Sequence, residues 1–366
     1  MKRYVPRCSM ALFVLLWGGV ACGGTDSQDS GGDGPCAGGP CSITWSNGPQ
    51  FPRPIENHTT AIFDDGEDQW LVVGAGQRTE NGQRSQLHTE IVGARISDDG
   101  SLGDWVELFD LSAPLSGHSQ VRHPEGGVIY LGGLTVFEDD LLSISQVTRF
   151  RLEEGDLSGQ SGNLLDDTFF NATAHVLNGQ VIVLGGNGSS GPQANVSTSP
   201  IVPEGVNGAW RDGPSLPAPR THHTSIVHDG RIYVFGGFNN VSDGITDVLR
   251  STHDASGNLT GWEIVGQWDE ARWSAPPFVH DGYIYLLGGK QGRGSAAKTV
   301  STVTRVELTD DGIGAMSDPQ QGLSHDRSHV SHAPFHQESG TVYSVGGRVG
   351  ETSSSTSRVL IGHLPE

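Results

Sequence analysis

The sequence has few charged residues and no cysteine beyond residue 41. Charged residues make up 17% of the 366 positions, and no long stretch of Leu, Ala, Glu and Lys repeats with helical period. After the first 21 residues no segment approaches the roughly 20 apolar residues that a membrane-spanning helix needs, so we expect a soluble body. Glycine is abundant, with 53 residues. This balance favours strands and turns over helices.

Basic residues are also scarce. The 22 Lys and Arg residues against 42 Asp and Glu residues give a formal net charge of −20 at pH 7. Because such a chain surrounds itself with a negative potential, the phosphate backbone of a nucleic acid would be repelled at most approaches. We therefore expect no nucleic-acid partner.

Motifs with a known catalytic or metal-binding mechanism are missing as well. The sequence has no Gly-x-Ser-x-Gly elbow, no His-Glu-x-x-His helix and no phosphate-binding loop. In the histidine-rich stretch 323–337, a spacing of three on a strand directs His329 and His332 to opposite faces, which disfavours a shared metal. The acidic turn "DDG" at 98–100 lacks the ligand ladder of a calcium loop. We therefore assign no catalytic residue, no metal and no cofactor.

The first 21 residues have the pattern of an export signal. Lys2, Arg3 and Arg7 precede an apolar segment at 10–17, and small residues follow it up to Cys22. The stretch "GGVACGG" resembles a bacterial lipobox. This resemblance implies a lipid on Cys22 that attaches the protein to a membrane, and an outer-membrane or cell-surface location. Without lipidation we expect a periplasmic or secreted protein.

Residues 22–42 are rich in Gly, Ser and Asp and cannot form a core, so we expect a flexible tether. Within the tether, Cys36 and Cys41 could close a small disulfide loop, which an oxidising compartment would preserve. All four cysteines lie in the first 41 residues. None of them can therefore cross-link the body, residues 43–366.

A short phrase recurs six times along the body. Each copy is an apolar run that ends in a glycine pair, such as "IYVFGG" at 232–237, and the first copy, "WLVVGA", has alanine in place of the second glycine. In register, the pairs are Gly74-Ala75, Gly132-Gly133, Gly185-Gly186, Gly236-Gly237, Gly288-Gly289 and Gly346-Gly347, at spacings of 58, 53, 51, 52 and 58. This regularity predicts a repeat architecture.

We predict four strands in each copy of the repeat. The first two are apolar at consecutive positions and joined by tight turns, so both of their faces should be covered. Two more strands follow the glycine pair, and Trp105, Trp210 and Trp262 mark the start of the fourth. Only 20 residues follow Gly346, too few for a fourth strand in the last copy. Because Trp45 has the spacing of a fourth-strand tryptophan, we expect the N-terminal segment to supply the missing strand and close a ring.

The predicted fold is therefore all-β, a six-bladed β-propeller of four-stranded antiparallel blades. Its repeats, about 50 residues long with a glycine pair after the second strand and a tryptophan in the fourth, resemble the kelch repeat over residues 43–366. In propellers of this type, the loop that enters the first strand and the loop after the glycine pair open on one face, which implies a polar rim around a central funnel. The implied rim residues are His58, His118, Asn171, His222, Ser274 and His329 at the entering positions, Arg220, Arg272 and Arg327 two residues earlier, and Gln77, Arg78, Asn187, Phe238, Asn239, Lys290 and Arg348 after the pairs.

Two interpretations of these rim residues stay open. Arg and His are common at the entering positions of kelch repeats and belong there to the scaffold; alternatively, the cations bind an anionic group such as a carboxylate.

Two enzymes have kelch-like propellers, galactose oxidase and a bacterial sialic-acid epimerase. The first needs a cysteine–tyrosine crosslink, and the body has no cysteine. We expect a monomeric, non-catalytic binding or scaffold module of the cell envelope with a protein or glycan ligand, and keep a sialic-acid epimerase or a lyase as the alternative.

Overall fold

The computed structural model describes residues 43–241, 244–293, 296–309, 312–317, 322–330, 332–350 and 353–364. The expected export signal, the tether and the four cysteines lie outside the described residues. Strands account for the regular elements of the described part. No helix in that part is long and apolar enough to cross a membrane.

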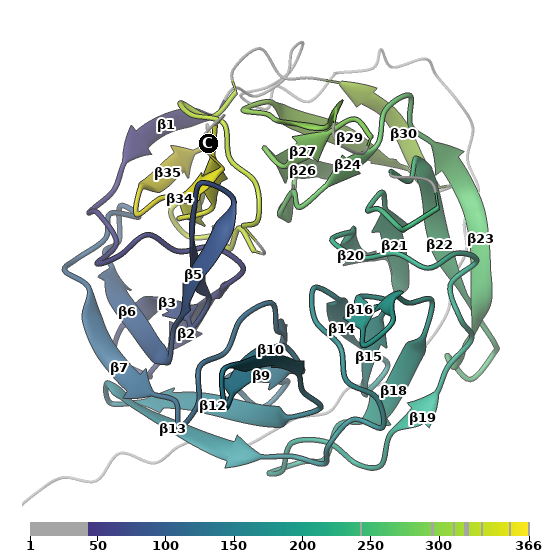
Figure 1. Cartoon of the computed structure of the whole chain (residues 1–366), viewed down its shortest axis with the longest axis horizontal. Coiled ribbons are helices and arrows are strands. Elements are labelled where there is room, and N and C mark those ends of the chain that lie inside the picture. Colours follow the sequence, from purple (N-terminus) through teal and green to yellow (C-terminus); the bar gives the residue numbers. More distant parts are fainter. Residues whose placement is uncertain are drawn as a thin grey trace, which may run out of the picture.

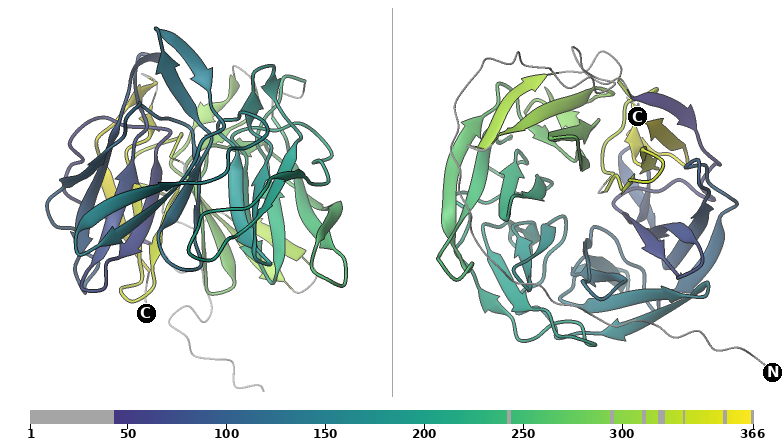
Figure 2. Two further views of the ribbon diagram at one scale, coloured as in Figure 1. Left: turned by 90° about the horizontal axis from the view of Figure 1, so that it is seen from below. Right: turned by 180° about the vertical axis from the view of Figure 1, so that it is seen from behind.

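The described residues form six four-stranded antiparallel sheets that surround a central axis (Figures 1 and 2). The strands of each sheet are given from the axis outward. The first sheet consists of β2 (Thr59–Asp64), β3 (Gln69–Gly74), β6 (Glu90–Ile96) and β7 (Val106–Asp110), and the second of β8 (Ser119–Arg122), β9 (Val128–Leu131), β12 (Val147–Glu153) and β13 (Asp156–Ser161). The third consists of β14 (Thr173–Leu177), β15 (Gln180–Leu184), β18 (Val196–Pro200) and β19 (Arg211–Asp212), the fourth of β20 (Thr224–His228), β21 (Arg231–Phe235), β22 (Asp247–His253) and β23 (Leu259–Gln267), and the fifth of β25 (Pro277–His280), β26 (Tyr283–Leu287), β29 (Val303–Thr309) and β30 (Gly312–Ser317). The sixth consists of β31 (Phe335–His336), β32 (Thr341–Val345), β35 (Val359–His363) and β1 (Thr44–Asn47). The all-β propeller of four-stranded sheets is thus confirmed.

Short ladders follow the second strands on one face of the ring. They are β4 (Gln77–Glu80) with β5 (Gln83–Leu87), β10 (Leu134–Phe137) with β11 (Asp140–Ser143), β16 (Asn187–Gly188) with β17 (Gly191–Pro192), β27 (Lys290–Gln291) between β24 (Arg272–Trp273) and β28 (Lys298–Thr299), and β33 (Arg348–Val349) with β34 (Ser354–Ser355). These ladders form the loop face.

The N-terminal strand completes the last sheet, as the sequence predicts. Trp45 of β1 pairs with Gly362 of β35, on the outer side of the sheet (Figure 1). Ile43, just before β1, is 2% exposed and packs in one cluster with Leu360 and Leu364. The two ends of the described chain therefore share one sheet and one core.

Six apolar clusters fill the spaces between neighbouring sheets, one for each pair of neighbours. For example, Leu71 and Val73 of β3 pack with Tyr343 and Val345 of β32. Apart from first residues, the second strands are buried along their length. This confirms that both faces are covered, and it explains why their apolar residues are consecutive.

The tryptophans expected in the outer strands connect one sheet to the next. Each donates its indole N–H to a carbonyl in the segment that follows the outer strand of the preceding sheet: Trp105 to Pro49 at 3.1 Å, Trp210 to Asn163 at 3.0 Å and Trp262 to Pro214 at 2.8 Å. A large side chain with one donor fits this position because its ring covers apolar surface while the N–H satisfies a carbonyl.

Each glycine pair turns the chain where the second strand ends. Both residues of the pair have positive φ, for example 57° at Gly236 and 88° at Gly237, and a Cβ on Gly237 would lie 2.8 Å from the carbonyl oxygen of Thr221. In the first sheet, the residues with these angles are Ala75 (φ 52°) and Gly76 (φ 103°), so the expected pair Gly74-Ala75 is corrected by one residue.

Gly74 is a glycine for another reason, because a Cβ there would collide with the hydroxyl of Tyr130 from the next sheet. The second residue of each pair donates its N–H to a carbonyl that precedes the next sheet; Gly76, for instance, donates to Leu115 at 2.7 Å. In the last sheet, Gly347 donates to Ile55 at 2.8 Å. This bond joins the last sheet to the first on the axial side.

Candidate binding site

Six residues with positive φ surround the axis just before the first strands begin. They are Asn57 (φ 50°), Gly117 (63°), Asn171 (52°), His222 (52°), Ser274 (52°) and His329 (58°), and we call them the axial ring. Backbone N–H groups link them in order, from Ser274 to His222 at 2.8 Å, His222 to Asn171 at 3.2 Å, Asn171 to Gly117 at 2.7 Å, Gly117 to Asn57 at 2.8 Å and Asn57 to His329 at 2.9 Å. This hydrogen-bonded chain fixes the side chains at the axis.

Two histidines expected at the entering positions lie one residue beyond the axial ring. His58 and His118 are 0% and 3% exposed, and the Nε2 of His118 lies 2.8 Å from the Oγ1 of Thr59. Burial lowers the pKa of both imidazoles to about 3, so they are neutral at pH 7. This placement corrects the expectation that they stand on the rim, because the residue with positive φ sets the register and the histidine follows it.

The three arginines expected on the rim are inside the protein. Arg220, Arg272 and Arg327 are 0%, 5% and 1% exposed. Arg220 Nη1 lies 2.9 Å from Asp247 and donates to the Gly236 carbonyl at 3.2 Å, Arg272 Nη2 donates to the Thr302 carbonyl at 3.0 Å, and Arg327 Nη1 donates to the Ser344 carbonyl at 3.0 Å. Each arginine thus connects the segment that enters a sheet to residues in or directly next to a later strand of the same sheet. The expectation of an exposed cation is corrected for these three residues, and their contacts fit the scaffold interpretation.

The rim itself is built from six two-residue bridges on the loop side of the axial ring. In each bridge, the residue just before the axial-ring residue pairs with the residue just after the glycine pair. The bridges are Glu56–Gln77, Ser116–Leu134, Phe170–Asn187, Thr221–Phe238, Trp273–Lys290 and Ser328–Arg348. Of the expected rim cations, Lys290 and Arg348 are therefore on the rim, and both are half-buried.

One sector of the rim combines a cation with aromatic rings. The Nζ of Lys290 lies 5.1 Å from the ring centroid of Trp273, and Phe238 lies 4.8 Å from the same indole. The imidazole of His222 stacks on Phe238 at 5.2 Å and contacts His329 at 5.5 Å. Because His222 and His329 enter different, non-neighbouring sheets, their contact lies at the axis.

The charge in this sector comes from the ammonium group. Burial lowers the pKa of His222 to about 3 and that of His329 well below its usual range, so both rings are neutral. Burial, and then the charge of Arg348, also lower the pKa of Lys290 from 10.5. A partly desolvated ammonium group attracts an anion more strongly than one in bulk water.

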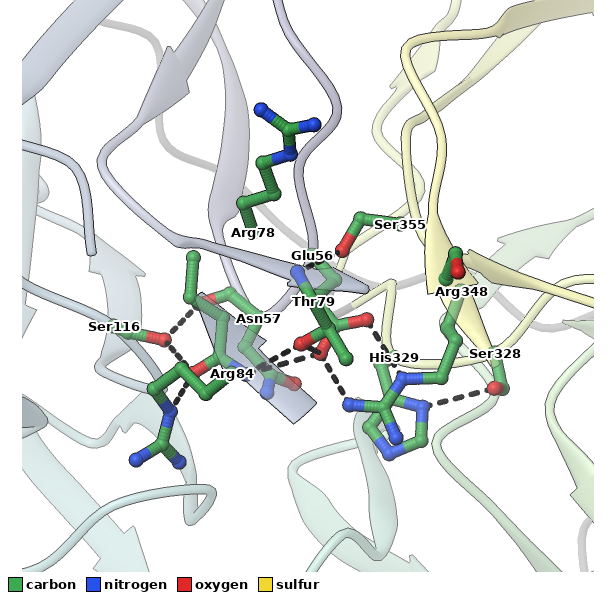
Figure 3. Close-up of polar contacts among 12 residues, drawn as sticks. Glu56, Asn57, Arg78, Thr79, Arg84, Ser116, Ser328, His329, Arg348 and Ser355 are labelled. Atoms are coloured by element: carbon green, nitrogen blue, oxygen red, sulfur yellow. Dashed lines mark hydrogen bonds and ion pairs between the residues drawn. The ribbon is translucent and has the colours of Figure 1, made fainter. Parts of the chain in front are cut away.

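A buried carboxylate holds Arg348 in place (Figure 3). Glu56 is 0% exposed and accepts hydrogen bonds from Arg348 Nε at 2.8 Å, Gln77 Nε2 at 3.0 Å and Thr79 Oγ1 at 2.7 Å, and Arg348 Nη2 also contacts it. Arg84 donates to the Oε1 of Gln77 at 2.9 Å. The carboxylate is thus satisfied from several sides, and the guanidinium of Arg348 is fixed at the rim next to His329.

Comparison with known proteins agrees with this geometry. A family model described as Kelch motif matches residues 219–250, which include the glycine pair at 236 and 237. A solved structure of YjhT has a TM-score of 0.65 to this chain at 12% sequence identity and covers 87% of this chain and 99% of its own. The chain has a kelch-repeat propeller fold.

Sequence relatives match only parts of this kelch propeller. An F-box/kelch-repeat protein of Arabidopsis thaliana is 38% identical over 86 residues, 22% of this chain and 21% of its own. N-acetylneuraminate epimerase of Escherichia coli (strain K12) is 33% identical over 72 residues, 19% of this chain and 20% of its own. Beta-scruin of Limulus polyphemus is 25% identical over 191 residues, 50% of this chain and 20% of its own. The chain therefore spans about a fifth of the length of these relatives.

Four residues of the site were not predicted from the sequence: Glu56, Thr79, Arg84 and Trp273. Glu56 and Trp273 occupy the same repeat position in the kelch propeller, just before the axial-ring residue. Had the first copy been aligned on Asn57 rather than His58, the repeat would have placed Glu56 beside Gln77. Arg84 has no such signal, because it lies at the variable end of a loop ladder.

Proposed function

We propose that this protein is a non-catalytic binding module whose rim binds a carboxylate-bearing ligand, a glycan or an acidic protein segment. The observation that carries the proposal is Lys290, which lies over Trp273 and near Arg348 in a chain of net charge −20. A cation beside an aromatic face suits a ligand that has an anionic group and an apolar face. The fixed position of Arg348 adds a second donor of defined direction.

The location belongs to the same proposal. The charged start of the chain, its apolar segment and the lipobox-like "GGVACGG" support an exported protein that is anchored through a lipid on Cys22 at the outer membrane or cell surface. The body acts there as a monomer. Mass measurement of the mature N-terminus tests the anchor, and a water-soluble wild type that partitions like a Cys22→Ser variant would contradict it.

An epimerase is not favoured. The segment that matches N-acetylneuraminate epimerase covers 20% of that enzyme, and the likeness to YjhT, at 12% identity, concerns the fold alone. Of the rim carboxylates, Glu56 is tied to Arg348, Gln77 and Thr79. These contacts suit a positioning role.

A Lys290→Gln variant tests the rim. We expect it to bind carboxylated glycans or acidic peptides about tenfold more weakly than the wild type, because a hydrogen bond to a charged group is worth about 1.5–3 kcal/mol. A glycan and peptide array identifies the ligand, and calorimetry gives its dissociation constants for the wild type and for the variant. Lys298→Gln is the matched control, since Lys298 is an exposed lysine on the neighbouring strand of the same small sheet. Equal weakening by both variants, or an array without a carboxylated ligand, would contradict the proposal.

A further inference from the structure

A cavity of about 730 Å³ lies on the axis, on the side of the axial ring away from the rim. Its walls are the inner strands, because the lining residues directly follow the axial-ring residues along the chain, whereas the rim is built from the residues just before the axial ring and just after the glycine pairs. The axial ring itself forms one end, where His222 and His329 are in contact at 5.5 Å. The volume falls in the range of about 300–1,000 Å³ that is typical of small-molecule sites.

The walls carry hydrogen-bonding groups and almost no charge. The lining includes the histidines His118, His175, His223 and His332 and the hydroxyl residues Ser119, Thr173 and Ser225. Among the described residues that line the cavity there is no carboxylate and no lysine, and the one arginine, Arg122, donates to the carbonyl of Ile62 at 2.6 Å. This lining differs from the cationic rim on the other side of the axial ring.

The lining histidines are neutral. Burial lowers the pKa of His118 to about 3, of His175 and His332 to about 4, and of His223 well below its usual range. A neutral imidazole has one donor and one acceptor. At pH 7 these rings therefore bring polar groups but no net charge to the cavity.

Hydroxyl groups of neighbouring sheets orient three of these rings. The Nε2 atoms of His118 and His223 each lie 2.8 Å from a threonine hydroxyl, that of Thr59 and that of Thr173, and the Nε2 of His175 lies 2.6 Å from the Oγ of Ser225. His332 enters the cavity from the last sheet, and its Nδ1 is buried without a hydrogen-bond partner among the described residues. Contacts between neighbouring sheets thus fix three of the four rings in the walls.

The chemistry of the walls selects the ligand class. A free anion would find no cation beyond Arg122, and a cation would find no carboxylate; the described residues also contain no cluster of His, Cys, Asp and Glu that could hold a metal ion. A purely apolar ligand would add no hydrogen bond to the polar groups of these walls. Valine and proline side chains of the same walls, Val121, Val176, Val330 and Pro277 among them, can cover C–H faces.

We propose that this cavity is a second binding site, separate from the rim, that takes a neutral polyhydroxylated molecule the size of a mono- or disaccharide. Hydroxyl groups both donate and accept, which matches neutral imidazoles and serine and threonine hydroxyls, while the C–H faces of a sugar ring pack on valine and proline. The proposal does not depend on the rim binding a ligand. It assigns the two sides of the axial ring to ligands of different charge.

Calorimetric titration of the full chain with glucose, N-acetylglucosamine, maltose and glycerol tests the cavity. We expect at least one of these neutral compounds to bind, and His332→Phe to weaken that binding about tenfold or more, because the larger apolar ring removes a hydrogen-bonding group and fills space. His228→Phe is the matched control, since His228 lies at the far end of β20 and does not line the cavity. If His332→Phe fails to fold, Ser225→Ala removes the hydroxyl that orients His175, and the same direction of change is expected.

The rim variant separates the two sites. Lys290→Gln is expected to keep the affinity for the neutral compound, because Lys290 lies on the other side of the axial ring. The proposal is overturned if none of the four compounds binds, which means that the cavity holds water alone. It is also overturned if binding survives unchanged in His332→Phe and Ser225→Ala, or if Lys290→Gln abolishes it.

Discussion

Acidification from pH 7 to about pH 5 is expected to remove most of the free energy of unfolding of this protein. Burial lowers the pKa of His58, His118 and His222 to about 3, and that of His175 and His332 to about 4. In the unfolded chain the same groups titrate near 6.5. Between these values the unfolded state binds more protons than the native state, so stability rises with pH through this window and is lost as the pH falls.

The expected size of this effect is large. At pH 5, a histidine that titrates near 3 or 4 in the native state and near 6.5 in the unfolded state lowers the stability by about 2 kcal/mol. Five such groups reach the net stability of a typical domain, about 5–15 kcal/mol. Because these rings line the axis, where six sheets converge, a charge on one ring also disfavours protonation of its neighbours; His332 has this effect on His58, His118 and His175.

Urea unfolding, measured by tryptophan fluorescence at pH values between 7 and 5, checks this prediction. Carboxylates contribute little above pH 5, because their ordinary pKa values lie near 4. A His118→Gln variant keeps a side chain that can bond to Thr59 and removes one titrating group, so its stability should fall less steeply with pH than that of the wild type. A wild-type stability that is flat between pH 7 and pH 5 would contradict the assignment of neutral, buried histidines.

The repeat and its closure could be predicted from the sequence, because they depend on local chemistry that every copy must keep. A tight turn next to a neighbouring backbone requires positive φ, which favours glycine, and the missing fourth strand follows from counting residues after Gly346. The slip of one residue in the first copy has a specific cause. Gly74 is required by the ring of Tyr130, while Ala75 accepts a φ of 52°, so the glycine pair that marks the turn elsewhere is displaced there.

The site could be predicted only in part, since burial of a charged side chain is a tertiary property. Arg220 and Lys290 are both cations in loops of the repeat, Arg220 before a first strand and Lys290 after a glycine pair. Nothing in the residues next to them predicts which of the two is buried. In the structure, Arg220 is closed in by Asp247 and the Gly236 carbonyl, whereas Lys290 remains half-buried over Trp273. Glu56 was missed for the related reason that its partner Arg348 is 292 residues away along the chain.

Removal of β1 is expected to abolish cooperative folding. Without residues 43–48, the outer edge of β35 loses its partner, and the cluster that contains Leu360 and Leu364 loses Ile43. An uncovered edge strand beside an exposed apolar surface also promotes aggregation. Thermal unfolding and size-exclusion chromatography of the truncated chain check this; an unchanged melting temperature in a monomeric truncated chain would contradict the role of β1.

Two single substitutions separate the packing of this segment from its hydrogen bonds. Ile43→Ala should lower the free energy of unfolding by about 2–5 kcal/mol, because it leaves a cavity among buried side chains. Thr44→Ala, on the exposed neighbour, should change it by less than about 0.5 kcal/mol. If a synthetic peptide of residues 43–49 restores the truncated chain to the wild-type melting temperature, pairing with β35 is sufficient to close the ring, because the peptide supplies the strand without a covalent link to the first sheet.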